Sequence, residues 1–230
     1  MLGVFVLVAL PESPTWLASR GQSKRMPTPL RDLVTPPLLR ITMIAIVISS
    51  IPMVGAWAAS KWMIPWADSI AGTANAGYKA STQGWWALGA TLGSFIGAQL
   101  ASWLGRRRSY LLISLSATIL TIAMFQCTAP LHPTFHPIVF AQGFVATLFF
   151  GWLAVYLPEL FPINVRATGS GLAFNSGRFA TAAGVLMAGW LFTALNGDYP
   201  KVGTICSLIY GFGIIAIWFA PDTSRKMIHL

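Results

Sequence analysis

Long apolar stretches separated by short polar segments form the main pattern of this 230-residue chain. A helix needs about 20 apolar residues to cross roughly 30 Å of hydrocarbon. Six stretches are of this kind, at residues 41–59, 82–104, 110–129, 138–157, 167–195 and 202–220. None of them alternates with the period of two that a membrane-spanning strand requires. The pattern therefore predicts an all-α membrane protein with a bundle of six transmembrane helices over residues 41–220.

The flanking segments do not continue this pattern. Residues 1–10 are apolar but too short to span a bilayer, and we expect them to be the end of a truncated transmembrane helix. Residues 11–40 contain several prolines and basic residues, which favours a linker over a continuous helix. Residues 221–230 form a polar tail.

Composition agrees with a membrane protein and explains the net charge. Apolar residues make up 55% of the chain and charged residues 9%, whereas a soluble domain has roughly 25% charged residues. Of the 15 Lys and Arg residues, all but four fall on the side of the linker, residues 105–109, residues 158–166 and the tail. The exceptions are Lys61, Lys79, Lys201 and Arg178. The positive-inside rule therefore predicts a cytoplasmic linker and tail, and it accounts for the net charge of +9 without a nucleic-acid partner.

Arg178 differs from the other basic residues because it falls inside a predicted span. It follows Ala167 by eleven positions, which places it roughly 16 Å into the membrane as a helix. A buried charge without a partner costs several kcal/mol, and the predicted spans contain no Asp or Glu. We expect Arg178 to face a cavity or an anionic substrate, with Asn175 on the same helix face; a structural salt bridge is the alternative. Gln99 and Gln142 are further substrate-binding candidates, unless they only bond neighbouring helices.

Small residues recur every four positions along the second predicted span, at Gly89, Gly93, Gly97, Ala101 and Gly105. This spacing places them on one helix face, where a neighbouring helix can approach closely. We expect tight packing at this face, and movement of the helices during transport is a functional alternative.

Four motifs fall at the predicted cytoplasmic side: PESPTWL at 11–17, LASWLGRRR at 100–108, PELFPINVRATG at 158–169 and PDT at 221–223. Together they resemble the C-terminal half of a major facilitator superfamily transporter of the sugar-porter or organic-acid (sialate or monocarboxylate) proton symporter branches. The run Asn175-Ser176-Gly177-Arg178 is more similar to the organic-acid branch. The resemblance implies half of a twelve-helix fold, so we expect a missing N-terminal six-helix half, or a second copy, as partner.

Charged residues of these motifs also suggest a gate. We expect helix-end charges to converge at the cytoplasmic mouth and hold it shut, namely Glu12, Arg106, Arg107, Glu159 and Arg166. Exposed ion pairs contribute about 0–1 kcal/mol each, so several together would form a reversible latch. The alternative is that these charges only set the topology.

The resemblance implies a secondary active transporter that moves a small organic solute by alternating access, with coupling to protons. An organic acid is the first expected substrate, and a sugar or other metabolite is the second. A non-transporting membrane fragment or accessory subunit is the alternative. We expect an integral protein of a bacterial inner membrane, surrounded by lipid.

Enzymatic chemistry has no support in the sequence. The predicted spans hold no paired acids, nucleophile–base set or metal ligands, and His132 and His136 lack acidic or cysteine companions. Cys127 and Cys206 are interpreted as small core residues. We therefore predict no enzyme activity, no cofactor and no metal.

Overall fold

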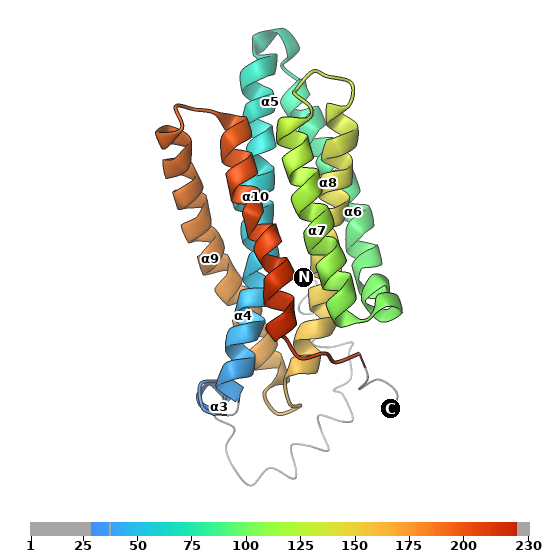
Figure 1. The fold of residues 1–230 in the computed structure, drawn as a ribbon, viewed down its shortest axis with the longest axis vertical. Coiled ribbons are helices and arrows are strands. Elements are labelled where there is room, and N and C mark those ends of the chain that lie inside the picture. The colour runs from blue at the N-terminus through green and yellow to red at the C-terminus, as the bar shows by residue number, and fades with distance from the viewer. Residues whose placement is uncertain (1–28, 37, 225–230) are drawn as a thin grey trace, which may run out of the picture.

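The computed structural model describes residues 29–36 and 38–224, and every regular element among these residues is a helix (Figure 1). The main helices are α3 (Pro29–Leu33), α4 (Leu38–Val54), α5 (Met63–Ala71), α6 (Tyr78–Leu104), α7 (Arg106–Gln126), α8 (Phe135–Leu160), α9 (Arg166–Ala194) and α10 (Tyr199–Ala216). Short turns of other helical types are η1 (Gly55–Ala59), η2 (Ser60–Trp62), η3 (Thr73–Asn75) and η4 (Ile217–Phe219). The predicted partial helix at 1–10, the first motif and Glu12 lie outside the described residues.

Five helical segments of the described chain are long and apolar enough to cross a membrane: Leu38–Ala71, Tyr78–Leu104, Arg106–Gln126, Phe135–Leu160 and Tyr199–Phe219. They match five of the six predicted spans. The remaining predicted span coincides with α9, a 29-residue helix whose Arg166, Asn175 and Arg178 make it more polar. A membrane crossing by α9 therefore stays a prediction.

The first span is longer than the sequence pattern predicted. Instead of ending at residue 59, the chain continues through the π-helical turn η1 and the turn η2 into α5, and the whole segment has 34 residues. Pro52 lies just before the wide turn, and a proline cannot donate the backbone hydrogen bond of a regular helix. The prediction was wrong because Lys61 interrupts the apolar pattern while the backbone remains helical.

Helices α6 and α8 pack closely because glycines line their contact. A Cβ atom added at Gly89, Gly93 or Gly97 would overlap a backbone carbonyl oxygen of α8. A larger residue at these positions would force the two helices apart. The predicted close packing of the small-residue face is therefore confirmed.

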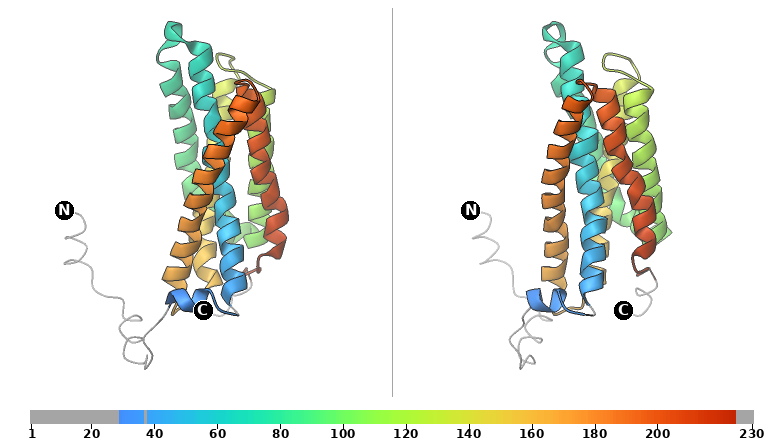
Figure 2. Two further views of the ribbon diagram at one scale, coloured as in Figure 1. Left: turned by 90° about the vertical axis from the view of Figure 1, so that its left-hand side faces the viewer. Right: turned by 60° about the vertical axis from the view of Figure 1, so that its left-hand side comes forward.

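The remaining helices surround an aromatic core between α7, α8, α4 and α10. Tyr110, Phe149, Trp152 and Tyr156 are all fully buried there, and the Tyr110 hydroxyl donates to the carbonyl of Ile48 at 2.9 Å. In Figures 1 and 2, α9 runs along one flank of the bundle beside α4, while α6 and α8 lie on the other side. Large apolar side chains on the outside, such as Phe95 and Trp190, would contact lipid or another apolar partner.

Candidate functional site

A buried ion pair joins α7 to α8 at one end of the bundle. The Nε and Nη2 atoms of Arg106 donate to the two carboxylate oxygens of Glu159 at 3.0 and 2.6 Å. The third nitrogen, Nη1, donates to the carbonyl of Ala101 at 2.7 Å. The side chain of Arg106 is 2% exposed and that of Glu159 is 21% exposed. The expectation of an exposed, weak pair was therefore wrong, since the guanidinium is fully enclosed and its contact with the carboxylate is bidentate.

The chain beyond α10 completes this ion pair. Thr223 donates its hydroxyl hydrogen to Glu159, and the backbone N–H of Arg106 donates to the Ser224 hydroxyl at 2.9 Å. Tyr156 donates to the carbonyl of Pro221 at 2.7 Å. Residues 221–224 therefore bind the ends of α7 and α8 together. The PDT motif indicated this segment, but only the fold shows that Thr223, 64 positions away in sequence, reaches Glu159.

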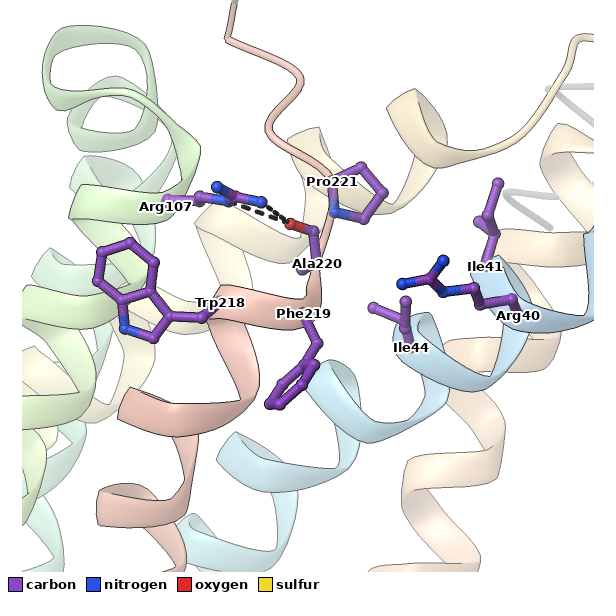
Figure 3. A pocket seen from close by; sticks show the side chains of 8 residues that line it. All are labelled: Arg40, Ile41, Ile44, Arg107, Trp218, Phe219, Ala220 and Pro221. Atoms are coloured by element: carbon purple, nitrogen blue, oxygen red, sulfur yellow. Dashed lines mark hydrogen bonds between the residues drawn. The ribbon is translucent and has the colours of Figure 1, made fainter.

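Arg107 lies beside the pair without joining it. Its Nε and Nη2 atoms donate to the carbonyl of Ala220 at 3.1 and 2.7 Å. It borders a pocket of about 600 Å³ that Arg40 of α4 borders from the opposite side (Figure 3). The rest of the lining comes from Ile41, Ile44, Trp218, Phe219, Ala220 and Pro221.

The other two predicted gate residues are not part of this cluster in the described structure. Arg166 begins α9, and its Nε makes a long 3.4 Å hydrogen bond to the carbonyl of Phe161. Glu12 lies outside the described residues. Of the five predicted charges, the fold thus pairs Arg106 with Glu159 and places Arg107 nearby. A gating role for them stays a prediction.

Arg178 lies near the middle of α9, with its side chain exposed on the surface of the bundle. Its guanidinium carbon is 6.0 Å from the centre of the Phe174 ring. None of the three ion pairs among the described residues includes it. Asn175 is exposed on the same helix and donates to the carbonyl of Gly171 at 2.8 Å. The charge of Arg178 is therefore available to a group outside the described bundle.

The two glutamines are not brought together with Arg178. Gln99 is exposed on α6, whereas Gln142 is fully buried inside the bundle. Gln142 accepts a hydrogen bond from the Trp86 ring at 2.8 Å and donates to the hydroxyls of Ser60 and Thr121. These contacts match the alternative interpretation, in which Gln142 only forms hydrogen bonds to neighbouring helices. They occupy both the oxygen and the nitrogen of its amide group, which are then not available to a solute.

Lys61 follows the first predicted span in the sequence, but in the structure it lies in η2, within a continuous helical segment. Its Nζ donates to Gln83 at 3.0 Å and lies 3.3 Å from the centre of a Trp86 ring. Lys61 lines one pocket of about 430 Å³ with Gln83, and an adjoining one of about 170 Å³ with Val185 of α9. None of the three ion pairs among the described residues includes Lys61. A lysine inside an otherwise apolar helix was the signal that could have identified it.

The described part of the chain combines long apolar helices, a buried ion pair at one end, and two cations along the helices that have no carboxylate partner among the described residues. These are features of a multi-pass membrane protein that handles polar solutes. Comparison with known families agrees. The family described as sugar (and other) transporter matches residues 66–229. The chain therefore belongs to this transporter family of the major facilitator superfamily.

Curated relatives are transporters as well. The probable 4-methylmuconolactone transporter of Cupriavidus pinatubonensis is 33% identical over 179 residues, which is 76% of this chain and 41% of the relative. The inner membrane metabolite transport protein YhjE of Escherichia coli is 27% identical over 236 residues, 98% of this chain and 52% of the relative. The chain thus spans about half the length of these relatives or less. The kinship is with membrane transporters and not with enzymes.

Proposed function

We propose that this chain forms the C-terminal half of a proton-coupled secondary transporter for small organic acids. Its helices would form one wall of a central solute pathway that opens alternately to the two sides of the membrane. An N-terminal six-helix half or a second copy of the chain would supply the other wall. Near the middle of the described spans no Asp or Glu occurs, so we assign the proton-carrying acid to that partner.

The observation that carries this proposal is a pair of cations, Arg178 and Lys61, that form no ion pair among the described residues. Arg178 belongs to α9, and Lys61 lines a pocket together with Val185 of the same helix. Val185 follows Arg178 by seven residues, which is about two helical turns and roughly 10 Å along one face. A carboxylate passing along this face would meet a cation at both levels.

Charge complementarity favours an acid over a neutral sugar. A guanidinium binds a carboxylate through two parallel hydrogen bonds, and the interaction strengthens away from water. A sugar could accept single hydrogen bonds from Arg178 but would leave its charge uncompensated in the membrane. The relative named for 4-methylmuconolactone adds support, because a muconic diacid that has closed to a monolactone retains one free carboxyl group.

The Arg106–Glu159 pair would close the cytoplasmic mouth in this scheme. It joins α7, α8 and the segment after α10, so opening that end requires a rearrangement of this contact. Separating this buried pair would cost more free energy than separating exposed pairs, which contribute about 0–1 kcal/mol each.

Uptake of labelled carboxylates by the intact transporter tests the role of Arg178. An Arg178→Lys substitution keeps the charge but loses the two-pronged geometry. We expect carboxylate uptake to fall by at least about tenfold, equivalent to about 1.4 kcal/mol. Arg108→Lys is the matched control, because Arg108 is an exposed arginine at the start of α7, and it should leave uptake unchanged. Full carboxylate uptake by Arg178→Lys would refute the proposal, and uptake of neutral sugars that is insensitive to the substitution would favour the sugar alternative.

A further inference from the structure

The pocket between Arg40 and Arg107 is not explained by solute transport. The guanidinium groups of the two arginines point toward each other from α4 and α7, across the chain that leaves η4 (Figure 3). Neither arginine takes part in the three ion pairs of the described residues. Arg107 uses two of its nitrogens on the Ala220 carbonyl, and its Nη1 makes no hydrogen bond within the described chain. The pocket is therefore positively charged at its rim.

An apolar groove continues from this pocket along the bundle. It has a volume of about 270 Å³ and lies between α4 and α10, where Val47, Ile48, Phe212 and Ile215 form part of its wall. Ile44 and Phe219 line both the groove and the charged pocket. The two cavities thus share a wall, with the charges at the helix ends and the apolar surface toward the middle of the helices.

A charged pocket that continues into an apolar groove fits a ligand with an anionic headgroup and an apolar chain. The charged pocket lies at the end of the bundle that the Lys and Arg distribution predicts to be cytoplasmic, where anionic lipids attract basic residues. Trp218, which is mostly exposed beside the pocket, is the type of residue found at the level of lipid headgroups. A free phosphate ion would use the arginines but not the groove, whereas a phospholipid would use both.

We propose that Arg40 and Arg107 bind the phosphate of an anionic phospholipid whose acyl chain lies in the groove between α4 and α10. The lipid would bridge the start of α4 to the start of α7 and the end of α10. Of these elements, α7 carries Arg106 of the Arg106–Glu159 pair, and α10 leads into the segment that closes over this pair. The bound lipid would thereby stabilise the closed arrangement of this end.

Native mass spectrometry of the full chain in detergent, titrated with defined lipids, tests this site. Phosphatidylglycerol should bind more tightly than zwitterionic phosphatidylcholine with the same acyl chains. Near a membrane surface each Lys or Arg contributes about 1 kcal/mol toward anionic lipid, so Arg40→Gln should weaken phosphatidylglycerol binding about fivefold. Arg107→Gln should do the same, and the double variant should remove the preference for phosphatidylglycerol. Arg108→Gln removes the same charge from the neighbouring exposed position and should change the affinity less than twofold.

Two further measurements separate the lipid from other anions and from misfolding. Val47→Trp fills the groove without changing the charge, and it should weaken binding of both lipids while leaving the arginines in place. Soluble glycerol phosphate should not displace phosphatidylglycerol at comparable concentration, because it has no acyl chain. Arg40 makes no side-chain hydrogen bond or ion pair within the described chain, so Arg40→Gln removes its charge without breaking such a contact. Equal affinity for both lipids, an equal effect of Arg108→Gln, or displacement by glycerol phosphate would each overturn the proposal.

Discussion

Glu159→Gln is the most direct test of the buried ion pair, because it changes one charge and hardly changes shape. In the native protein the carboxylate accepts two hydrogen bonds from Arg106 and one from Thr223. Glutamine retains one acceptor oxygen but presents an N–H₂ group where the second oxygen stood. The Arg106 charge, 2% exposed, would then lack its counter-ion.

The expected loss of stability follows from these contacts. Removing one partner of a buried ion pair costs about 3–5 kcal/mol. The lower end applies here, because glutamine keeps one acceptor and the Ala101 carbonyl still binds Nη1 of Arg106. We therefore expect Glu159→Gln to reduce the free energy of unfolding by about 3 kcal/mol. Denaturant unfolding in detergent micelles, followed by tryptophan fluorescence, measures this change.

A double-mutant cycle with Arg106→Met isolates the pair. In the Arg106→Met background there is no buried guanidinium to leave uncompensated, so Glu159→Gln should then cost less than about 1 kcal/mol. A cost below about 0.5 kcal/mol in the native background, or the same cost in both backgrounds, would show that the two side chains do not depend on each other.

Three further predictions, one of them with a control substitution, are tested by the same unfolding measurement. Gly93→Ala should destabilise the protein by more than about 2 kcal/mol, because the added Cβ would collide with the Phe144 carbonyl. The control Gly84→Ala lies in the same helix, where the added Cβ meets no other atom, and it should stabilise the protein by about 0.5–1 kcal/mol. Equal effects of the two substitutions would contradict the close packing of α6 and α8. Gln142→Leu should cost about 1–3 kcal/mol, since it leaves the half-buried Trp86 ring N–H and the buried Ser60 and Thr121 hydroxyls without this partner. A neutral result would argue against this network. Asp198 caps α10, and hydrogen bonds from Lys201 lower the pKa of its carboxyl. The contribution of this carboxylate to the free energy of unfolding should therefore be complete above the unfolded pKa of about 3.9, and it should be lost as the pH falls through the lower folded pKa. Asp198→Ala should therefore cost about 1 kcal/mol at neutral pH and show less loss of stability on acidification, and an unchanged pH profile would contradict the cap.

Much of the site is a tertiary arrangement that local patterns do not contain. Arg106 and Glu159 could be assigned to the same end of the bundle, because both lie in segments between predicted spans on the side that holds most of the Lys and Arg residues. Their burial could not be predicted, since it depends on Trp152 and on residues 221–224 closing over them. Gln142 and Gln99 look equivalent as lone glutamines in apolar helices, but only one of them faces the interior.

Apolar length and the placement of basic residues alone determined the class of this protein, five of its apolar helices, its predicted orientation and the central position of Arg178. These properties depend on the hydropathy and charge of residues that are close together in the sequence, so they can be predicted without knowing how the helices pack. The tertiary structure decided which charges meet. It buried Arg106 against Glu159, kept the first span helical past Lys61, and left Lys61 and Arg178 without a carboxylate among the described residues. Those outcomes depend on contacts between helices far apart in sequence, where the energy of a charge is set by its surroundings and not by its neighbours in the chain.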